Sequence, residues 1–376
     1  LELCFPSTSV GMTLDFKLIN EKDLIKILFS EKVGVVLQSN EDLAVSFAKK
    51  GINAVKVGTV NLTGVLKIEE FDIQVKELRK IWMSTSSKLE TKQTKSELAT
   101  IRLENVTKQP LSFRFPEKFD GKTPKYKSNR IKAAVLREKG SNSEREMAYM
   151  MDLCGFKVRD VHMTDLIKGR ETLEDIQLLV AVGGFSNSDV LGSAKGWAGA
   201  FKYNTKAKAA LENFFSRTDT LSLGVCNGCQ LFIELGLLYT NHIQKPKMMH
   251  NKSGKFECIF TAVNIKPSSS IMLKGLEGSI LGIWAAHGEG RFSFPKAEIN
   301  YQIPAKYLYE GYPSNPNGSD FNAAMLVSDN GRHLVMMPHL ERSTFPWNWG
   351  HYPNNRKDQV SPWILAFENA YNWLKK

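Results

Sequence analysis

The sequence predicts an α/β protein whose larger part has a mostly parallel sheet covered by helices on both faces. The first observation is that, from residue 131 onward, short continuously apolar stretches alternate with segments of helical periodicity. Strands buried on both faces have this composition, because helices cover each side of a parallel sheet. The second is the composition of the 376 residues, 42% apolar and 24% charged, which excludes collagen, coiled-coil and disordered chains and fits about two or three domains.

Residues 1–77 predict a small, incomplete α/β domain. Helical and strand patterns alternate here, but the expected strands are too few to complete a sheet. The chain also begins with Leu1 rather than Met, so we expect a piece of a longer protein. The expected elements are a helix at 19–31, a strand at 33–38, a helix at 41–50 capped by Asn40 and ended by Gly51, and a strand at 54–59.

Residues 78–130 have the composition of a connector. Residues 78–98 predict a polar helix rich in Lys, Ser and Thr, and residues 107–130 contain three prolines among many charges. Such a composition is typical of a linker, or of a segment laid over another domain. Both interpretations stay open at this point.

The basic residues are unevenly distributed. The formal charge is 50 − 39 = +11, and residues 66–132 hold 16 Lys and Arg against 9 Asp and Glu, or +7. A basic stretch can bind nucleic acid. No recognised nucleic-acid module or aromatic–basic pattern accompanies it, so we expect no nucleic-acid partner. The alternatives are a solvated linker and a face that meets a phosphorylated substrate or an acidic partner.

Residues 131–376 predict the alternating elements of the main domain. The turn Asp329-Asn330-Gly331 separates two apolar stretches, which indicates a hairpin. The expected strands are 132–137, 157–162, 177–182, 221–225, 282–286, 323–328 and 333–337, and the expected helices are 144–153, 206–216, 227–235 and 361–375.

The sequence favours a cytoplasmic protein. Its longest apolar runs are far too short to cross a bilayer, and it shows no secretory signal, so we expect no membrane association. The five cysteines are odd in number and scattered, which argues against a disulfide framework and for a reducing compartment.

The strongest chemical signal is LSLGVCNGCQ at residues 221–230. Within it, Gly224-Val225-Cys226-Asn227-Gly228 has the spacing of a nucleophile elbow, with cysteine as the nucleophile. The glycines permit a sharp strand-to-helix turn, which lifts Cys226 above the carboxyl ends of the strands, where open α/β sheets place their sites. The turn also puts Cys226 at a helix N-terminus, where the helix dipole favours a thiolate.

The pair Cys226-x-x-Cys229 has two other interpretations. A redox pair would belong to a thioredoxin-like unit, and a zinc site would need two more ligands at suitable spacing; the sequence offers neither. We therefore expect no metal here, and we expect Cys229 to face away from Cys226 and to pack in the core.

His339 is the candidate base. It follows the expected strand at 333–337, and Glu341 stands two residues later. A carboxylate at this spacing can hold the imidazole in one tautomer and orientation, which is the third role in a catalytic triad. For each of the other six histidines, a surface or core position is the ordinary alternative.

Two glycine-containing turns can complete a pocket. Gly183-Gly184-Phe185-Ser186 follows the expected strand at 177–182, and its backbone N–H groups, with that of Asn227, can form an oxyanion hole. An ordinary tight turn is the alternative. His287-Gly288-Glu289-Gly290 follows the expected strand at 282–286 and is a candidate pocket wall.

Several motifs together resemble the class I (triad) glutamine amidotransferase domain of phosphoribosylformylglycinamidine synthases. The resemblance covers residues 131–376, and residues 1–77 resemble the C-terminal remnant of an AIR-synthase-like synthetase domain, followed by a connector over 78–130. The motifs are GVCNGCQ (224–230), GGFSNSDVLG (183–192), AHGEGR (286–291), NPNGS (315–319) and MMPHLER (336–342).

The resemblance implies a flavodoxin-like fold and a glutaminase activity. It implies that Cys226 is the nucleophile, His339 the base and acid, and Glu341 the orienting carboxylate. Substrate contacts are implied for Gln230, Phe185 and His287. The partners implied are glutamine and the synthetase domains of a longer chain, which would use the ammonia.

In such a longer chain, ATP and Mg²⁺ would drive the conversion of formylglycinamide ribonucleotide to its amidine in purine biosynthesis, and the glutaminase domain itself would need no cofactor. The sequence contains no P-loop, as expected if most of the synthetase part is absent.

The sequence departs from the family pattern at two loops. Leu340 stands where the family often has Pro, and Asn187-Ser188 where it often has Tyr-Gly, so we expect the geometry of these loops, rather than the chemistry, to differ from the family. Another cysteine hydrolase on the same α/β frame and an inactive docking module are the alternative functions.

Overall fold

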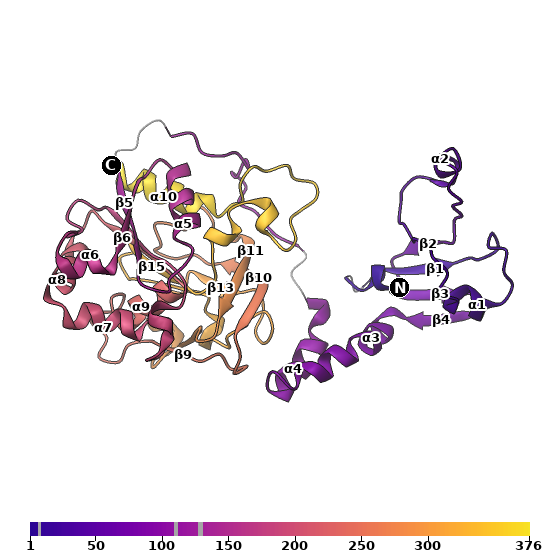
Figure 1. Cartoon of the computed structure of the whole chain (residues 1–376), viewed down its shortest axis with the longest axis horizontal. Helices are drawn as coiled ribbons and strands as arrows, with labels where there is room; N and C mark the ends of the chain where they lie inside the picture. The colour runs from indigo at the N-terminus through magenta and orange to yellow at the C-terminus, as the bar shows by residue number, and fades with distance from the viewer. Residues whose placement is uncertain (7–8, 109–111, 127–130) are drawn as a thin grey trace. The chain divides into compact units, whose positions relative to one another are not determined.

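The computed structural model describes residues 1–6, 9–108, 112–126 and 131–376. The chain forms two compact units, Leu1–Lys92 and Gln93–Lys376 (Figure 1). The boundary between them falls inside residues 78–130, the segment whose composition predicts a connector. Each unit has a hydrophobic core of its own.

The smaller unit is built on a four-stranded sheet with the order β2-β1-β3-β4. Strand β1 pairs in parallel with β3, and the other two pairings are antiparallel. Its core is small, with Cys4, Leu66, Ile68 and Val75 as its buried centre. The elements are β1 (Gly11–Leu14), β2 (Gly58–Asn61), β3 (Val65–Ile68), β4 (Phe71–Gln74), α1 (Leu24–Phe29), α2 (Ala44–Ala48) and α3 (Val75–Glu90).

Several expectations for this unit are wrong. The apolar run at 33–38 forms no strand: Val33 and Val35 are exposed, because no described strand of the unit pairs with them. Helix α1 is shorter than expected because it begins after Asp23, whose side chain accepts hydrogen bonds from two backbone N–H groups. Helix α2 has Leu43, not Asn40, at its N-cap.

The strands of this unit were mostly not expected from the sequence. The strand predicted at 54–59 instead spans Gly58–Asn61, and β1, β3 and β4 were missed. Each has only four residues, and β4 is exposed along its whole length, so neither apolar alternation nor length marks it.

The segment after α3 lies on the larger unit. The expected helix at 78–98 is two helices, α3 and α4 (Ser96–Glu104). Further on, Arg114 exchanges backbone hydrogen bonds of 3.0 and 2.8 Å with Ile280. The Phe115 ring packs against Trp349, with ring centroids 5.7 Å apart. Residues 112–126 are therefore laid over the larger unit; residues 109–111 and 127–130 lie outside the described part.

The larger unit has the mostly parallel sheet that the sequence predicts. Its order is β14-β15-β8-β7-β5-β6, and every pairing is parallel except β14 with β15. The Asp329-Asn330-Gly331 turn joins that antiparallel pair. The strands are β5 (Lys132–Arg137), β6 (Lys157–His162), β7 (Leu178–Ala181), β8 (Leu221–Val225), β14 (Met325–Val327) and β15 (His333–Met336).

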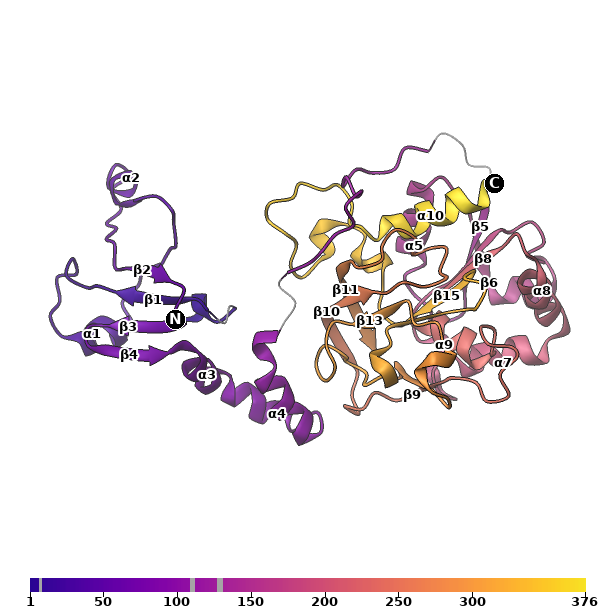
Figure 2. The ribbon, with the colours of Figure 1, turned by 180° about the vertical axis from the view of Figure 1, so that it is seen from behind.

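Helices cover both faces of this sheet (Figures 1 and 2). Helices α5 (Glu144–Leu153) and α10 (Ile364–Leu374) lie on one face. The other face carries α6 (Met163–Lys168), α7 (Lys195–Tyr203), α8 (Thr205–Ser216) and α9 (Asn227–Glu234). Helices α6 and α7 were not expected from the sequence, because the first is only six residues long and the second contains two glycines.

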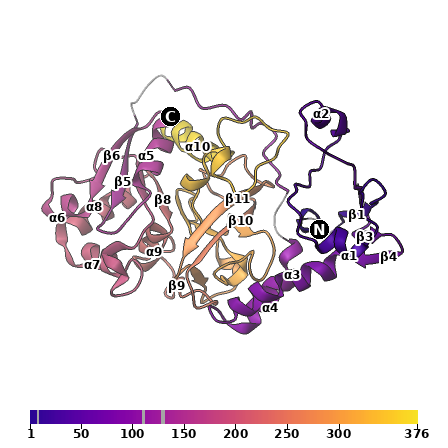
Figure 3. The ribbon, with the colours of Figure 1, turned by 45° about the vertical axis from the view of Figure 1, so that its right-hand side comes forward.

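Smaller antiparallel sheets stand beside the main sheet (Figure 3). One has the order β11-β10-β13, and its strand β11 extends the predicted 282–286 at both ends. The bounds are β9 (Lys247–Met249), β10 (Glu257–Ile265), β11 (Ile280–His287), β12 (Arg291–Ser293) and β13 (Ala305–Tyr307). Short 3₁₀ turns occupy Glu2–Cys4, Val106–Lys108, Ser186–Asp189, Glu298–Asn300, Asp320–Asn322, Glu341–Ser343 and Pro346–Asn348.

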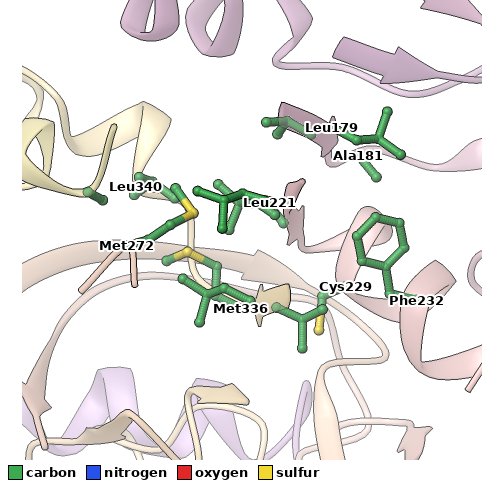
Figure 4. Close-up of a cluster of buried hydrophobic side chains, with 14 of the residues drawn as sticks. Leu179, Ala181, Leu221, Cys229, Phe232, Met272, Met336 and Leu340 are labelled. Atoms are coloured by element: carbon green, nitrogen blue, oxygen red, sulfur yellow. The ribbon is translucent and has the colours of Figure 1, made fainter. Parts of the chain in front are cut away.

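The core of the larger unit lies on both sides of its central strands. The side chains of β7 and β8 are buried along their whole length. Figure 4 shows Cys229 among these side chains, with Phe232 and Met336. No helix in the described part of the chain combines the length and the apolar character that crossing a membrane requires.

Truncating a central core side chain should destabilise the larger unit. Leu223 on β8 is fully buried, so we expect Leu223→Ala to lower the free energy of unfolding of this unit by about 2–5 kcal/mol, through lost burial and a residual cavity. Urea unfolding followed by tryptophan fluorescence measures this. Leu191→Ala is the matched control, because Leu191 is 71% exposed; equal losses in both variants would contradict the assigned core.

Candidate active site

Cys226 sits on a strained turn between β8 and α9. Its backbone has φ 50° and ψ −104°, a region that residues other than glycine rarely adopt. The flanking glycines make the turn possible: a Cβ on Gly224 would lie 2.6 Å from the Gly228 carbonyl oxygen, and one on Gly228 would lie 2.0 Å from that of Ala181. Sequence spacing and local geometry thus agree on an elbow that presents the Cys226 thiol.

Strand β15 delivers His339 to the same place. It runs parallel to β8, and the Cys226 N–H donates to the Met336 carbonyl at 2.8 Å. The His339 N–H then donates to the Trp284 carbonyl of β11 at 2.7 Å, which fixes the backbone of the residue. A Cβ on Gly183 would lie 2.8 Å from His339 Cε1 and 3.4 Å from Cys226 Cβ, so the two side chains meet beside Gly183.

Glu341 holds the imidazole. Its Oε1 lies 2.6 Å from His339 Nδ1, and both side chains are almost completely buried. Burial opposes a charged imidazole, but the Glu341 carboxylate and then the Cys226 thiol outweigh it and raise the pKa of His339 to about 9. Burial likewise opposes ionisation of Glu341, yet His339 keeps the pKa of that carboxyl below its usual range. Nε2, the other ring nitrogen, has no hydrogen-bond partner within the geometric limits among the described residues.

The loop after β7 forms a wall beside the thiol. Asn142 N–H donates to the Gly183 carbonyl and Phe185 N–H to the Gly140 carbonyl, each at 2.8 Å. Gly184 has φ 122°, and a Cβ there would lie 2.4 Å from Ser141 Cα. In the described part of the chain, the backbone N–H groups of Gly184 and Asn227, like that of Gly183, make no hydrogen bond in the turns and loops. These two donors are therefore available to a ligand oxygen.

A cavity of about 410 Å³ opens in front of Cys226. Of the residues singled out from the sequence, Gly184, Phe185, Cys226, Gln230 and His287 line it. Gly183, Asn227, His339 and Glu341 stand behind this lining rather than in it. The other lining residues are Asp189, Ser193, His250, Gly254, Lys255, Phe256, Ala286, Gly288 and Glu289.

His287 and Gln230 both bond to protein partners, although His287 Nδ1 has none among the described residues. His287 Nε2 lies 2.9 Å from Asn317 Nδ2, and burial, with a further contribution from His339, lowers the pKa of His287 to about 3, so the ring is neutral. The Gln230 amide bonds to Asn227 at 2.9 Å and to the Glu289 carbonyl at 2.8 Å.

Two carboxylates line the cavity: Glu289, in the turn 287–290 that the sequence predicts as a pocket wall, and Asp189, which was not expected there. Asp189 Oδ2 accepts from the Ser193 hydroxyl at 3.1 Å, and Glu289 Oε2 accepts from the Ser193 N–H at 3.4 Å. Burial, and then the Glu289 charge, raise the pKa of Asp189. Lys255 supplies a positive charge to the same cavity. These residues come from separate loops, and no spacing in the sequence connects them.

Cys226 lines the cavity, whereas Cys229 packs in the core. Both are free thiols, and Cys229 is fully buried in the core, which raises the pKa of its thiol well above the usual range. Residues 1–6, 9–108, 112–126 and 131–376 contain no group of three or more His, Cys, Asp or Glu side chains placed to hold a metal ion.

Residues 130–374 match the CobB/CobQ-like glutamine amidotransferase domain family. The chain belongs to this family. Among solved structures, PurLQS from Thermotoga maritima is similar to this glutamine amidotransferase domain, with a TM-score of 0.51 and 25% identity over 65% of this chain and 99% of that one.

Two curated relatives are similar over nearly the whole chain. A probable phosphoribosylformylglycinamidine synthase, chloroplastic/mitochondrial, from Arabidopsis thaliana is 37% identical over 100% of this chain and 29% of its own length. The phosphoribosylformylglycinamidine synthase from Homo sapiens is 36% identical over 99% of this chain and 31% of its own length. The chain thus spans less than a third of the length of these relatives.

Removing the Glu341 charge should change the pH dependence of stability. The imidazole of an unfolded chain loses its proton near pH 6.5, whereas folded His339 holds it to about pH 9. The stabilisation from this pair is therefore complete below about pH 6.5 and is lost as the pH rises to about 9. We expect the free energy of unfolding to fall over that interval by about 1–3 kcal/mol more in the wild type than in Glu341→Gln.

Urea unfolding of the larger unit at several pH values tests this. Glu212→Gln on the exposed surface of α8 is the matched control and should follow the wild type. A Glu341→Gln profile that runs parallel to the wild type would contradict the coupling between His339 and Glu341.

Proposed function

We propose that this domain hydrolyses L-glutamine to glutamate and ammonia through a cysteinyl thioester. One observation carries the proposal: the buried His339–Glu341 pair converges on a cysteine held in a strained elbow, at the wall of a cavity large enough for an amino acid. Membership of the glutamine amidotransferase family supports the choice of substrate.

The geometry supports a stepwise mechanism. Cys226 gives its thiol proton to His339 Nε2, and the sulfur adds to the carboxamide carbon of glutamine. The carboxamide oxygen, now negatively charged, is stabilised by the N–H groups of Gly184 and Asn227. Protonated His339 donates from Nε2 to the departing ammonia, and a thioester remains on Cys226. The neutral imidazole then takes a proton from water, whose oxygen attacks the thioester carbon. The carbon–sulfur bond breaks, glutamate is released, and the proton on His339 restores the Cys226 thiol. Throughout, Glu341 holds Nδ1 and so fixes the imidazole beside Cys226.

The charges of the cavity complement a zwitterionic amino acid. The carboxylates of Asp189 and Glu289 can bind an α-ammonium group, and Lys255 can attract an α-carboxylate. A buried carboxylate oxygen needs a partner charge or hydrogen bonds, and Asp189 Oδ1, which is buried although the residue is only half-buried, has none among the described residues. This pattern favours glutamine over simple aliphatic amides.

We further propose that the ammonia serves a synthetase part of a longer protein. The named relatives are phosphoribosylformylglycinamidine synthases, and this chain matches less than a third of each. The ammonia would be used in the ATP-dependent conversion of formylglycinamide ribonucleotide to its amidine in purine biosynthesis. ATP and Mg²⁺ belong to that synthetase part, and residues 1–77 are proposed as its C-terminal remnant. A cytoplasmic location is part of this proposal, although the name of the Arabidopsis relative places that protein in an organelle.

Substituting the nucleophile tests the glutaminase reaction. Cys226→Ala should abolish ammonia release from glutamine, because no other thiol lines the cavity within the described residues, while the thermal unfolding midpoint stays near that of the wild type. Cys229→Ala is the matched control and should keep most of the activity, because Cys229 is buried in the core. Equal ammonia release from the wild type and Cys226→Ala would remove the assignment.

The carboxylate pair gives a second test. Asp189→Asn should raise KM for glutamine by about tenfold, the effect expected for a lost charge-assisted hydrogen bond. It should leave hydrolysis of glutaramate, which lacks the α-amino group, nearly unchanged. Steady-state ammonia assays with both substrates measure this, and Asp219→Asn, away from the cavity, is the control. Equal loss with both substrates would show that Asp189 does not bind the ammonium group.

A further inference from the structure

We propose that the side chains of Asn227 and Gln230 are positioning residues, which lock the loop 183–186 against Cys226 through a chain of hydrogen bonds of fixed direction. This inference rests on the proposed glutaminase function, and it gives Gln230 a different task from the substrate contact that the family resemblance implies. We call this chain of bonds the amide relay; it consists of Ser186, Asn227, Gln230 and Glu289.

The amide relay connects three walls of the cavity. The Ser186 backbone N–H, in the loop after β7, donates to Asn227 Oδ1 at 3.2 Å. Asn227 Nδ2 donates to Gln230 Oε1 at 2.9 Å, one helical turn along α9. Gln230 Nε2 donates to the Glu289 backbone carbonyl at 2.8 Å, in the loop after β11.

The direction of every bond is fixed by the two ends. A backbone N–H only donates, so the Asn227 atom that faces Ser186 must be the oxygen. A backbone carbonyl only accepts, so the Gln230 atom that faces Glu289 must be the nitrogen. The two remaining atoms, Asn227 Nδ2 and Gln230 Oε1, are then a matched donor and acceptor. Neither amide can flip without breaking a bond at one end.

Burial makes these bonds costly to lose. Asn227 is completely buried, Gln230 is 3% exposed and Ser186 is 1% exposed. Water therefore has little access to these bonds, and an unpaired buried polar group is strongly unfavourable. The amide relay therefore holds the loop after β7 and the loop after β11 in one arrangement.

The amide relay also decides which backbone N–H groups near Cys226 can bind an oxyanion. Phe185 N–H is bonded to Gly140 and Ser186 N–H to Asn227, so neither can reach a ligand. The N–H groups of Gly184 and Asn227 are among those without a hydrogen bond in the described part of the chain. The Asn227 side chain accepts the hydrogen bond of Ser186, which lies two residues after Gly184. Asn227 therefore fixes the distance between its own backbone N–H and that of Gly184. A displacement of about 1 Å in such a site can reduce the rate by about 100-fold.

Near-isosteric variants without charge test the inference. Asn227→Leu removes both bonds of Asn227, and Gln230→Met removes both bonds of Gln230. Each should lower kcat for ammonia release by about 10- to 100-fold and change KM less than about threefold, because the oxyanion charge develops only in the transition state. Asn213→Leu on the exposed face of α8 is the control and should match the wild type.

Two further readouts separate positioning from other roles. Alkylation of Cys226 by iodoacetamide forms no oxyanion, so its rate should stay within about threefold of the wild type in both variants. Hydrogen exchange of the Ser186 amide should become at least about tenfold faster in Asn227→Leu, because its acceptor is gone. Thermal unfolding confirms that the variants fold.

The outcomes are distinguishable. If Gln230→Met raises KM and keeps kcat, Gln230 contacts the substrate and the inference is overturned. Unchanged kinetics in both variants overturn it as well. If the wild type releases no ammonia from glutamine, the proposed function fails instead, and Ser186 exchange then decides the relay: unchanged exchange in Asn227→Leu rejects it, and faster exchange supports it.

Discussion

The parallel pairing of β8 with β7 on one side and β15 on the other is the constraint on which the candidate site depends. Parallel strands end at the same edge of a sheet, so whatever follows them in the sequence meets there. Here β7 is followed by the Gly183–Gly184 turn, β8 by Cys226 and β15 by His339. The register of the backbone hydrogen bonds therefore brings together three segments separated by more than 40 residues from one another.

The site is electrostatically divided into two parts. Behind the thiol, a buried carboxylate and imidazole neutralise each other, and their mutual attraction outweighs the cost of burial for both. In front of it, the cavity holds carboxylates and a lysine with neutral His287 beneath. The neutrality of His287 follows from its burial, and it keeps a second positive charge away from His339. The inner part suits proton transfer and the outer part suits recognition of a charged ligand.

The features that could be predicted from the sequence are those that one continuous stretch of residues specifies. The mostly parallel fold is confirmed, because the mainly apolar runs at Lys132–Arg137 and Leu221–Val225 each form a strand over the predicted range. The elbow and the H-x-E pair are also local, and their geometry is consistent with the prediction, while their catalytic roles stay predictions. Asp189 and Lys255 enter the cavity from unrelated loops, which no spacing reveals. The run at 33–38 was misassigned because an apolar stretch becomes a strand only where another strand pairs with it.

The segment 112–126 belongs to the folded larger unit, although it precedes the residues of the family match. The family match starts at residue 130, but Arg114 extends the edge of β11 by a backbone bridge, and Phe113 and Phe115 place their rings on Trp349. A version of the protein cut at the family boundary would uncover this aromatic surface and leave a strand edge open to pairing with other molecules, a familiar route to aggregation. The folded unit therefore includes at least the segment 112–126 in addition to the residues of the family match. Expression of the domain alone should keep this segment.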